Sequence, residues 1–142
     1  MKKLIAIIPI FISSVATATD LLLWRENSDS IMIDRYSIQR IFTRQITRWP
    51  NGQHISVFIK PKESVEHRDF VVRTLGISPF YYEQQLERQT YAGKSSSVTE
   101  IPTDIAMVQR VENTPGAIGY INYEIYIGSK KVIIVDTDTI TN

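Results

Sequence analysis

The chain has 142 residues, 43% of them hydrophobic, and this length supports one domain with a buried core. Its lack of cysteine excludes disulfides and thiolate chemistry, and its two histidines are too few for us to propose a metal site. Basic residues exceed acidic ones by a single charge, so the near-balanced charge argues against a nucleic-acid-binding protein.

The first 18 residues have the layout of a secretory signal peptide. Lys2 and Lys3 are followed by an apolar run over residues 4–15 and by the small-x-small cleavage site Ala16–Ala18. The run is short for a spanning helix, and an uncleaved anchor is the alternative. We expect cleavage near Ala18–Thr19, a single domain over residues 19–142, and a periplasmic location without membrane attachment after cleavage.

A strand that leads into a capped helix forms the centre of the chain. Residues 55–59 are an apolar strand, residues 60–63 a loop, and residues 65–75 a helix that Gly76 closes in the left-handed conformation. Ser64 stands at the N-cap position. The first turn of such a helix has free N–H groups that could hold an anion, although a capped helix without a ligand produces the same pattern.

The preceding part of the chain predicts a strand over residues 20–24 and a helix capped by Ser37. The apolar stripe of this helix consists of Ile38, Ile41, Phe42 and Ile46. A neighbouring basic stripe consists of Arg40, Arg44 and Arg48. We interpret the basic stripe as a solvated face, with an anion-facing surface as the alternative.

The next predicted helix is capped by Ser78, with Pro79 in its first position and with Tyr82 and Leu86 on one face. The region is the most aromatic of the chain, with Phe80, Tyr81, Tyr82 and Tyr91. We interpret these rings mainly as packing residues, with a stacking platform for a sugar or base as the alternative.

The C-terminal part predicts one helix, a turn and two strands. Thr103 caps the helix, whose buried face is drawn from Ile105, Met107, Val108 and Val111. A type II turn over residues 113–116 leads to strands over residues 117–121 and 131–135. The small residues of the first strand would let another element approach closely. The order of elements indicates an α/β fold.

Three passages resemble phosphate-type periplasmic substrate-binding proteins. Residues 41–52 are similar to their I-F-x-G-x-I-x-x-W passage, and residues 111–120 (V-E-N-T-P-G-A-I-G-Y) to their V-x-x-x-P-G-A-I-G-Y passage. Residues 64–70 match the place of their phosphate loop and following helix. The resemblance implies a short, single-lobe domain of the type II periplasmic binding fold, with a mixed, mostly parallel sheet covered by helices.

The resemblance also implies a ligand site. Ser64 matches the family's serine, the N–H groups of Val65 and Glu66 would contribute dipoles, and Arg68 would supply charge. Lys62 and Lys94 are weaker candidates. The chain departs from the family's Ser-Gly-Thr loop, because Val65 replaces the glycine and Glu66 adds a negative charge.

Two functions follow from this reading. The first is an exported solute-binding-like protein that takes phosphate or another small oxyanion for ABC-type uptake or sensing, with an ABC permease as partner. The alternative is a ligand-free cell-envelope interaction or assembly module, such as a homodimer, built on one lobe. We predict no enzyme and no cofactor, since no nucleophile, base and orienting group can be assembled from the sequence.

Overall fold

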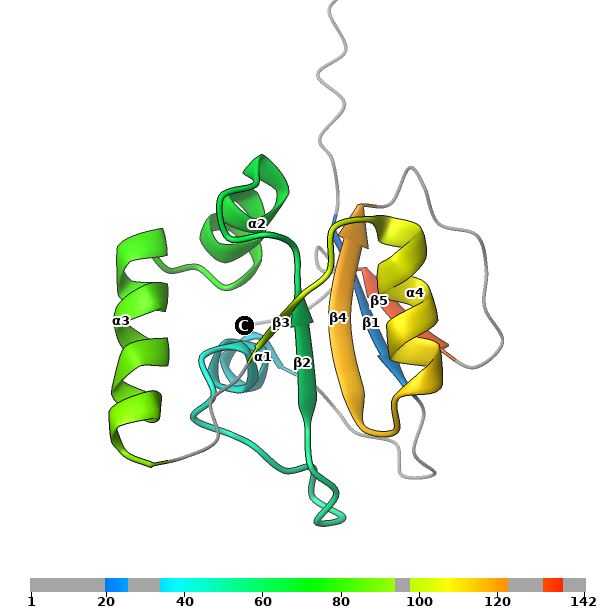
Figure 1. The fold of residues 1–142 in the computed structure, drawn as a ribbon, viewed down its shortest axis with the longest axis horizontal. Coiled ribbons are helices and arrows are strands. Elements are labelled where there is room, and N and C mark those ends of the chain that lie inside the picture. The colour runs from blue at the N-terminus through cyan, green and yellow to red at the C-terminus, as the bar shows by residue number, and fades with distance from the viewer. Residues whose placement is uncertain (1–19, 26–33, 94–97, 123–131, 137–142) are drawn as a thin grey trace, which may run out of the picture.

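The computed structural model describes residues 20–25, 34–93, 98–122 and 132–136. These residues form one five-stranded sheet with helices on both faces (Figure 1). The predicted signal peptide and Lys94 lie outside the described residues. The elements, in chain order, are β1 (Asp20–Arg25), α1 (Arg35–Phe42), β2 (Ser56–Ile59), α2 (Val65–Asp69), the π-helical η1 (Phe70–Thr74), α3 (Pro79–Tyr91), β3 (Thr99–Glu100), α4 (Asp104–Asn113), β4 (Ala117–Asn122) and β5 (Val132–Asp136).

The strand order across the sheet is β3-β2-β4-β1-β5. Strand β2 is parallel to β3 and β4, whereas β1 is antiparallel to both β4 and β5. Four strands therefore point one way and β1 points the other, which confirms the predicted mixed, mostly parallel α/β sheet. Strand β3 was not predicted, because two exposed residues carry no periodicity.

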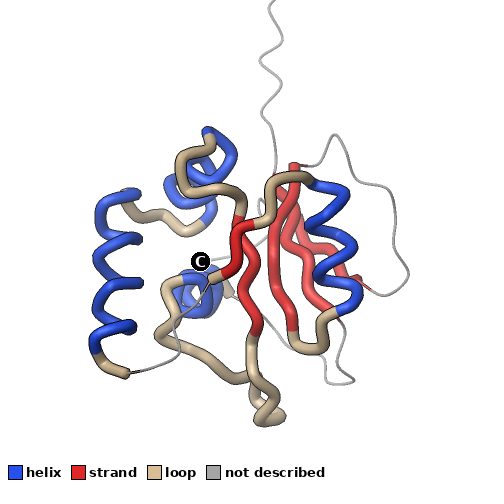
Figure 2. The backbone as a smooth tube through the Cα atoms, viewed as in Figure 1, coloured by secondary structure: helices blue, strands red, loops and turns tan. Residues whose placement is uncertain are grey.

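Helices lie on both sides of the sheet (Figure 2), and the buried apolar residues form two clusters. Val57 and Ile59 of β2 pack with α1, η1 and α3 on one face, while Phe58 packs with α4 on the other. Because side chains alternate along a strand, β2 is buried on both faces, as its continuous apolar run indicates.

Serine and threonine caps start three of the helices, as predicted. The side chains of Ser64, Ser78 and Thr103 accept hydrogen bonds from the backbone N–H groups three residues later. The prediction for α1 was wrong: its N-cap is Asp34, whose carboxylate accepts a hydrogen bond from the Ser37 N–H at 2.6 Å. An aspartate three residues upstream is an equally good cap, so the helix begins one turn earlier.

The predicted basic stripe was wrong at Arg44. Helix α1 ends at Phe42, and Arg44 has a left-handed backbone with φ of +62°. Its side chain turns inward, is buried, and donates a hydrogen bond from Nη1 to the Ile55 carbonyl at 3.0 Å. Ile46 lies beyond the helix and is only partly buried against the core.

The aromatic residues of α3 divide into two groups. Tyr82 is buried, as predicted, but Phe80, Tyr81 and Tyr91 are 78%, 42% and 91% exposed, so the packing interpretation was wrong for these three. In α4, Met107 and Val111 are buried, whereas Ile105 is exposed, contrary to prediction.

Candidate functional site

The starts of α2 and α4 lie at the same edge of the sheet (Figure 1). Strands β2, β3 and β4 are parallel, so their carboxyl ends meet there. Strand β2 leads through residues 60–64 into α2, and β3 leads through residues 101–103 into α4. In open α/β sheets this carboxyl edge is where ligands usually bind.

The first turn of α2 is capped but open to solvent. The Ser64 hydroxyl accepts a hydrogen bond from the His67 N–H at 3.1 Å, and the Ser64 carbonyl accepts one from the Arg68 N–H at 3.2 Å. Within the described part of the chain, the N–H groups of Val65 and Glu66 have no acceptor. Both residues are exposed, so these two N–H groups could donate to a bound oxyanion.

Arg68 borders a cleft of about 400 Å³ between α2 and the start of α3. Its lining consists of Lys62, Glu63, His67, Arg68, Pro79, Phe80, Tyr82 and Glu83. Lys62 Nζ lies 3.1 Å from a carboxylate oxygen of Glu83. Of the predicted site residues, Arg68 and the weaker candidate Lys62 line this cleft, whereas Ser64, Val65 and Glu66 form the adjoining turn and do not line it.

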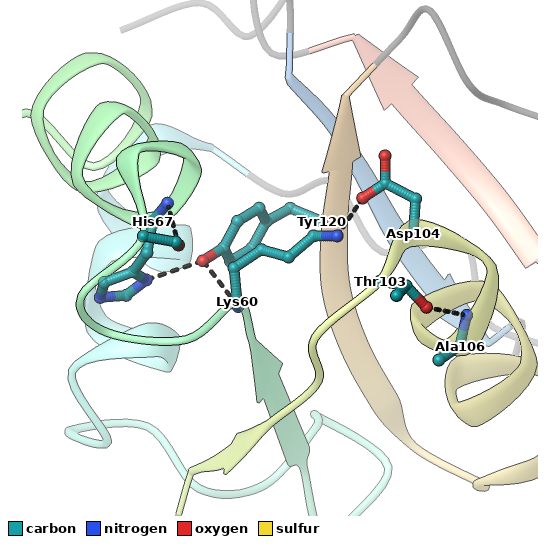
Figure 3. Close-up of polar contacts among 7 residues, drawn as sticks. Lys60, His67, Thr103, Asp104, Ala106 and Tyr120 are labelled. Atoms are coloured by element: carbon teal, nitrogen blue, oxygen red, sulfur yellow. Dashed lines mark hydrogen bonds and ion pairs between the residues drawn. The ribbon is translucent and has the colours of Figure 1, made fainter.

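A buried hydrogen-bond chain that sequence reasoning missed supports this turn. The Tyr120 hydroxyl accepts a hydrogen bond from the Lys60 N–H at 2.9 Å and lies 2.7 Å from Nδ1 of His67 (Figure 3). Burial lowers the pKa of His67 below its usual value of 6.5, so the imidazole is neutral at pH 7. These contacts of the Tyr120 hydroxyl connect the end of β2 and the first turns of α2 to β4.

A buried ion pair connects the same edge to α4. Lys60 Nζ contacts the Asp104 carboxylate, and the two side chains are only 8% and 10% exposed (Figure 3). Asp104 lies in the first turn of α4, where the helix dipole favours a negative charge. The sequence signal for this pair is a lysine directly after an apolar strand, which places a cation at the carboxyl edge.

The charges around the candidate site are mixed. Three basic residues (Lys60, Lys62 and Arg68) stand with four acidic ones (Glu63, Glu66, Glu83 and Asp104). An oxyanion would therefore depend on directed hydrogen bonds more than on a positive field. In the described segments no three metal-ligating side chains cluster, and no helix has the length and apolarity needed to cross a membrane.

The geometry defines an α/β lobe with an open helix start at its carboxyl edge. The sequence matches no family model and no curated protein. Solved structures do match: PstS from Borrelia burgdorferi at 16% identity and a TM-score of 0.54, over 75% of this chain and 42% of that one. A phosphate-binding protein from Stenotrophomonas maltophilia matches at 13% identity and a TM-score of 0.55, over 80% of this chain and 37% of that one.

A possible phosphate binding protein from Planctomyces limnophilus matches at 19% identity and a TM-score of 0.51, over 75% of this chain and 37% of that chain. The chain thus spans about two fifths of the length of these structures. Its fold is that of a single lobe of a phosphate-type binding protein, which confirms the fold that the sequence resemblance implied. At these identities the similarity concerns the fold.

Proposed function

We propose that the chain is an exported, periplasmic solute-binding-like protein whose lobe holds phosphate or a similar small oxyanion for ABC-type uptake or sensing. The observation that carries the proposal is the exposed first turn of α2, where the N–H groups of Val65 and Glu66 have no acceptor within the described residues. The ABC-type phosphate transport receptor from Vibrio cholerae has a similar fold, with a TM-score of 0.50, which supports an ABC permease as partner.

Ser64, Val65, Glu66 and Arg68 have separate roles in this proposal. The Ser64 side chain keeps the turn rigid through its cap, the two free N–H groups donate to the oxyanion, and the exposed Arg68 guanidinium supplies the countercharge. Because Glu66 is an exposed carboxylate in the same turn, we expect binding to be weaker than an all-neutral loop would give.

Calorimetric titration of the purified protein with inorganic phosphate tests this site. We expect Arg68→Ala to weaken binding by at least about tenfold, because a charge-assisted hydrogen bond contributes roughly 1.5–3 kcal/mol. Arg88→Ala is the matched control, since Arg88 is also an exposed helical arginine but lies in the last turn of α3. Equal affinities for the two variants, or no heat with any of the proteins, would reject the site.

The exposed aromatic side chains of α3 support a second candidate, an envelope interaction or assembly module. Phe80 and Tyr91 are among the most exposed large apolar side chains that the structure describes. They lie eleven residues, or about three turns, apart on the face of α3 that points away from the core residues Tyr82 and Leu86. Exposed aromatic side chains on one helix face fit a protein-binding surface, and a homodimer is the simplest partner.

Light scattering after size-exclusion chromatography tests this second candidate. We expect the wild-type protein to form a dimer and the double variant Phe80→Ser/Tyr91→Ser to be monomeric. Tyr36→Ser serves as the control, because Tyr36 is 65% exposed but belongs to α1. A monomeric wild type at all concentrations would exclude the homodimer.

A further inference from the structure

The carboxyl edge of the sheet already holds an anion, and that anion belongs to the chain itself. The Asp104 carboxylate contacts Lys60 Nζ, and both side chains are at least nine-tenths buried. Among the described residues, Lys60 is the one buried lysine. A carboxylate offers a negative charge and acceptor oxygens, as a small oxyanion does, so it can satisfy the groups that would otherwise bind one.

The position of Asp104 at the start of α4 strengthens the comparison of its carboxylate with a bound oxyanion. The residue directly follows the N-cap Thr103, whose hydroxyl accepts a hydrogen bond from the Ala106 N–H at 3.2 Å. A carboxylate in the first turn interacts favourably with the positive end of the ten-residue helix α4. The Asp104 carboxylate is therefore held by the Lys60 ammonium (Figure 3) and lies in the first turn of α4, two features that an anion-binding site also offers its ligand.

We propose that Asp104 is a tethered anion that occupies Lys60 and thereby sets the affinity of the carboxyl edge for an external oxyanion. The inference rests on the proposed function, because it concerns how the same edge of the sheet receives its ligand. Tethering gives the Asp104 carboxylate an effective concentration of roughly millimolar or higher at Lys60. An external anion must displace it, so a doubly charged tetrahedral oxyanion competes better than a monocarboxylate.

The contacts of Lys60 indicate which group would move when an external anion binds. Lys60 is held at both ends, because its backbone N–H donates to the Tyr120 hydroxyl while its side chain contacts Asp104. Displacement of Asp104 would leave the position of the Lys60 backbone unchanged and would free only the ammonium group. Binding at Lys60 therefore requires the Asp104 side chain to move away, while β2 keeps its position.

Phosphate titration of Asp104→Asn tests the inference, since asparagine keeps the shape of the side chain and removes its charge. We expect phosphate to bind at least tenfold more tightly than to the wild type, and the double variant Lys60→Met/Asp104→Asn to lose that gain. Asp104→Ser provides a second neutral background if asparagine lowers the melting temperature. Asp69→Asn is the matched control, because it breaks an exposed ion pair with Arg73.

The outcomes separate this inference from the proposed function. An unchanged phosphate affinity in both Asp104 variants, together with weaker binding by Arg68→Ala, would overturn the tethered anion and leave the α2 site in place. Tighter binding that depends on Lys60 but not on Arg68 would support the tethered anion and reject the α2 site. Absence of phosphate binding in every variant would overturn both.

Discussion

The ring of Tyr120 lies flat on the ring of Phe70, with centroids 3.7 Å apart and planes inclined by 5°. The same side chain carries its hydroxyl to the Lys60 N–H and to His67. Tyr120 thus joins the apolar core beneath η1 to the polar edge where α2 begins. The packing of the core and the position of the candidate site therefore depend on one residue.

Tyr120→Phe separates these two contributions. Phenylalanine retains the stack on Phe70 but leaves the Lys60 N–H without its acceptor and Nδ1 of His67 without its partner. We expect the free energy of unfolding to fall by about 1–3 kcal/mol in urea denaturation, the typical cost of buried groups left unsatisfied. Tyr91→Phe is the control, because Tyr91 is 91% exposed, and we expect it to change stability by less than about 0.5 kcal/mol. Equal effects would contradict the buried role of the Tyr120 hydroxyl.

The buried imidazole of His67 predicts a loss of stability in mild acid. Burial lowers its pKa in the folded protein below the usual 6.5, so below about pH 6.5 the unfolded chain binds more protons than the folded one. The free energy of unfolding therefore falls as the pH decreases from 6.5 toward the folded-state pKa. We expect His67→Gln to reduce this fall between about pH 7.5 and 5.5 in urea denaturation.

His54→Gln is the control for this pH dependence. His54 is exposed in a turn region that pairs with Arg48 through a backbone bridge. Its replacement removes an imidazole that the fold leaves exposed, so it tests whether burial is required for the effect. A slope that both variants reduce equally would mean that the acid sensitivity does not come from burial of His67.

Local signals in the sequence were sufficient for the parts of the fold that short-range chemistry controls. Ser64, Ser78 and Thr103 each precede an apolar helical pattern, and each is an N-cap because its oxygen satisfies a nearby N–H group. The Pro115–Gly116 turn was likewise predicted: the Ala117 N–H donates to the Thr114 carbonyl at 3.1 Å, and Gly116 has φ of +73°.

Contacts between distant segments lay beyond such signals. Arg44 belongs to a basic stripe only if α1 continues, but the helix ends at Phe42 and the Arg44 side chain donates to the Ile55 carbonyl, eleven residues away. The pairing of Lys60 with Asp104 depends on which strands are neighbours, which periodicity does not specify. The candidate site also combines local and distant contacts. The cap at Ser64 bonds a residue three positions along the chain, whereas the contact of His67 with Tyr120 joins residues 53 positions apart.

Two glycines with similar backbones should respond differently to an added methyl group. Gly116 and Gly76 have φ of +73° and +70°, so alanine is strained at both. At Gly116, however, the new Cβ would lie 2.4 Å from the His54 carbonyl oxygen, whereas at Gly76 nothing lies within 4 Å. We expect Gly76→Ala to cost about 1 kcal/mol and Gly116→Ala clearly more, because the backbone near His54 must also move.

Thermal unfolding of both variants measures this difference. Gly76→Ala reports the cost of the left-handed backbone alone, and the additional loss in Gly116→Ala reports the close approach of residues 53–54 to the turn. Equal melting temperatures for the two variants would show that the turn can move away from His54 at no cost.

The close contact of β4 with α4 depends on the absence of a side chain at Gly119. A Cβ at this position would lie 2.7 Å from Sδ of Met107 and 3.2 Å from Cγ2 of Val111, and both residues are buried. This agrees with the prediction that small residues in the strand let another element approach. We expect Gly119→Ala to destabilise the protein by about 1–3 kcal/mol through overpacking.

Met107→Ala provides the rescue that identifies the cause. Alone it should cost roughly 2–5 kcal/mol, because it leaves a cavity beneath α4. Combined with Gly119→Ala it removes the sulfur that the new methyl group would meet, so the double variant should be more stable than the sum of the single effects by at least about 0.5 kcal/mol. Urea denaturation of the four proteins gives this coupling energy. Strict additivity would indicate that Gly119→Ala acts through the backbone of β4 and not through its contact with Met107.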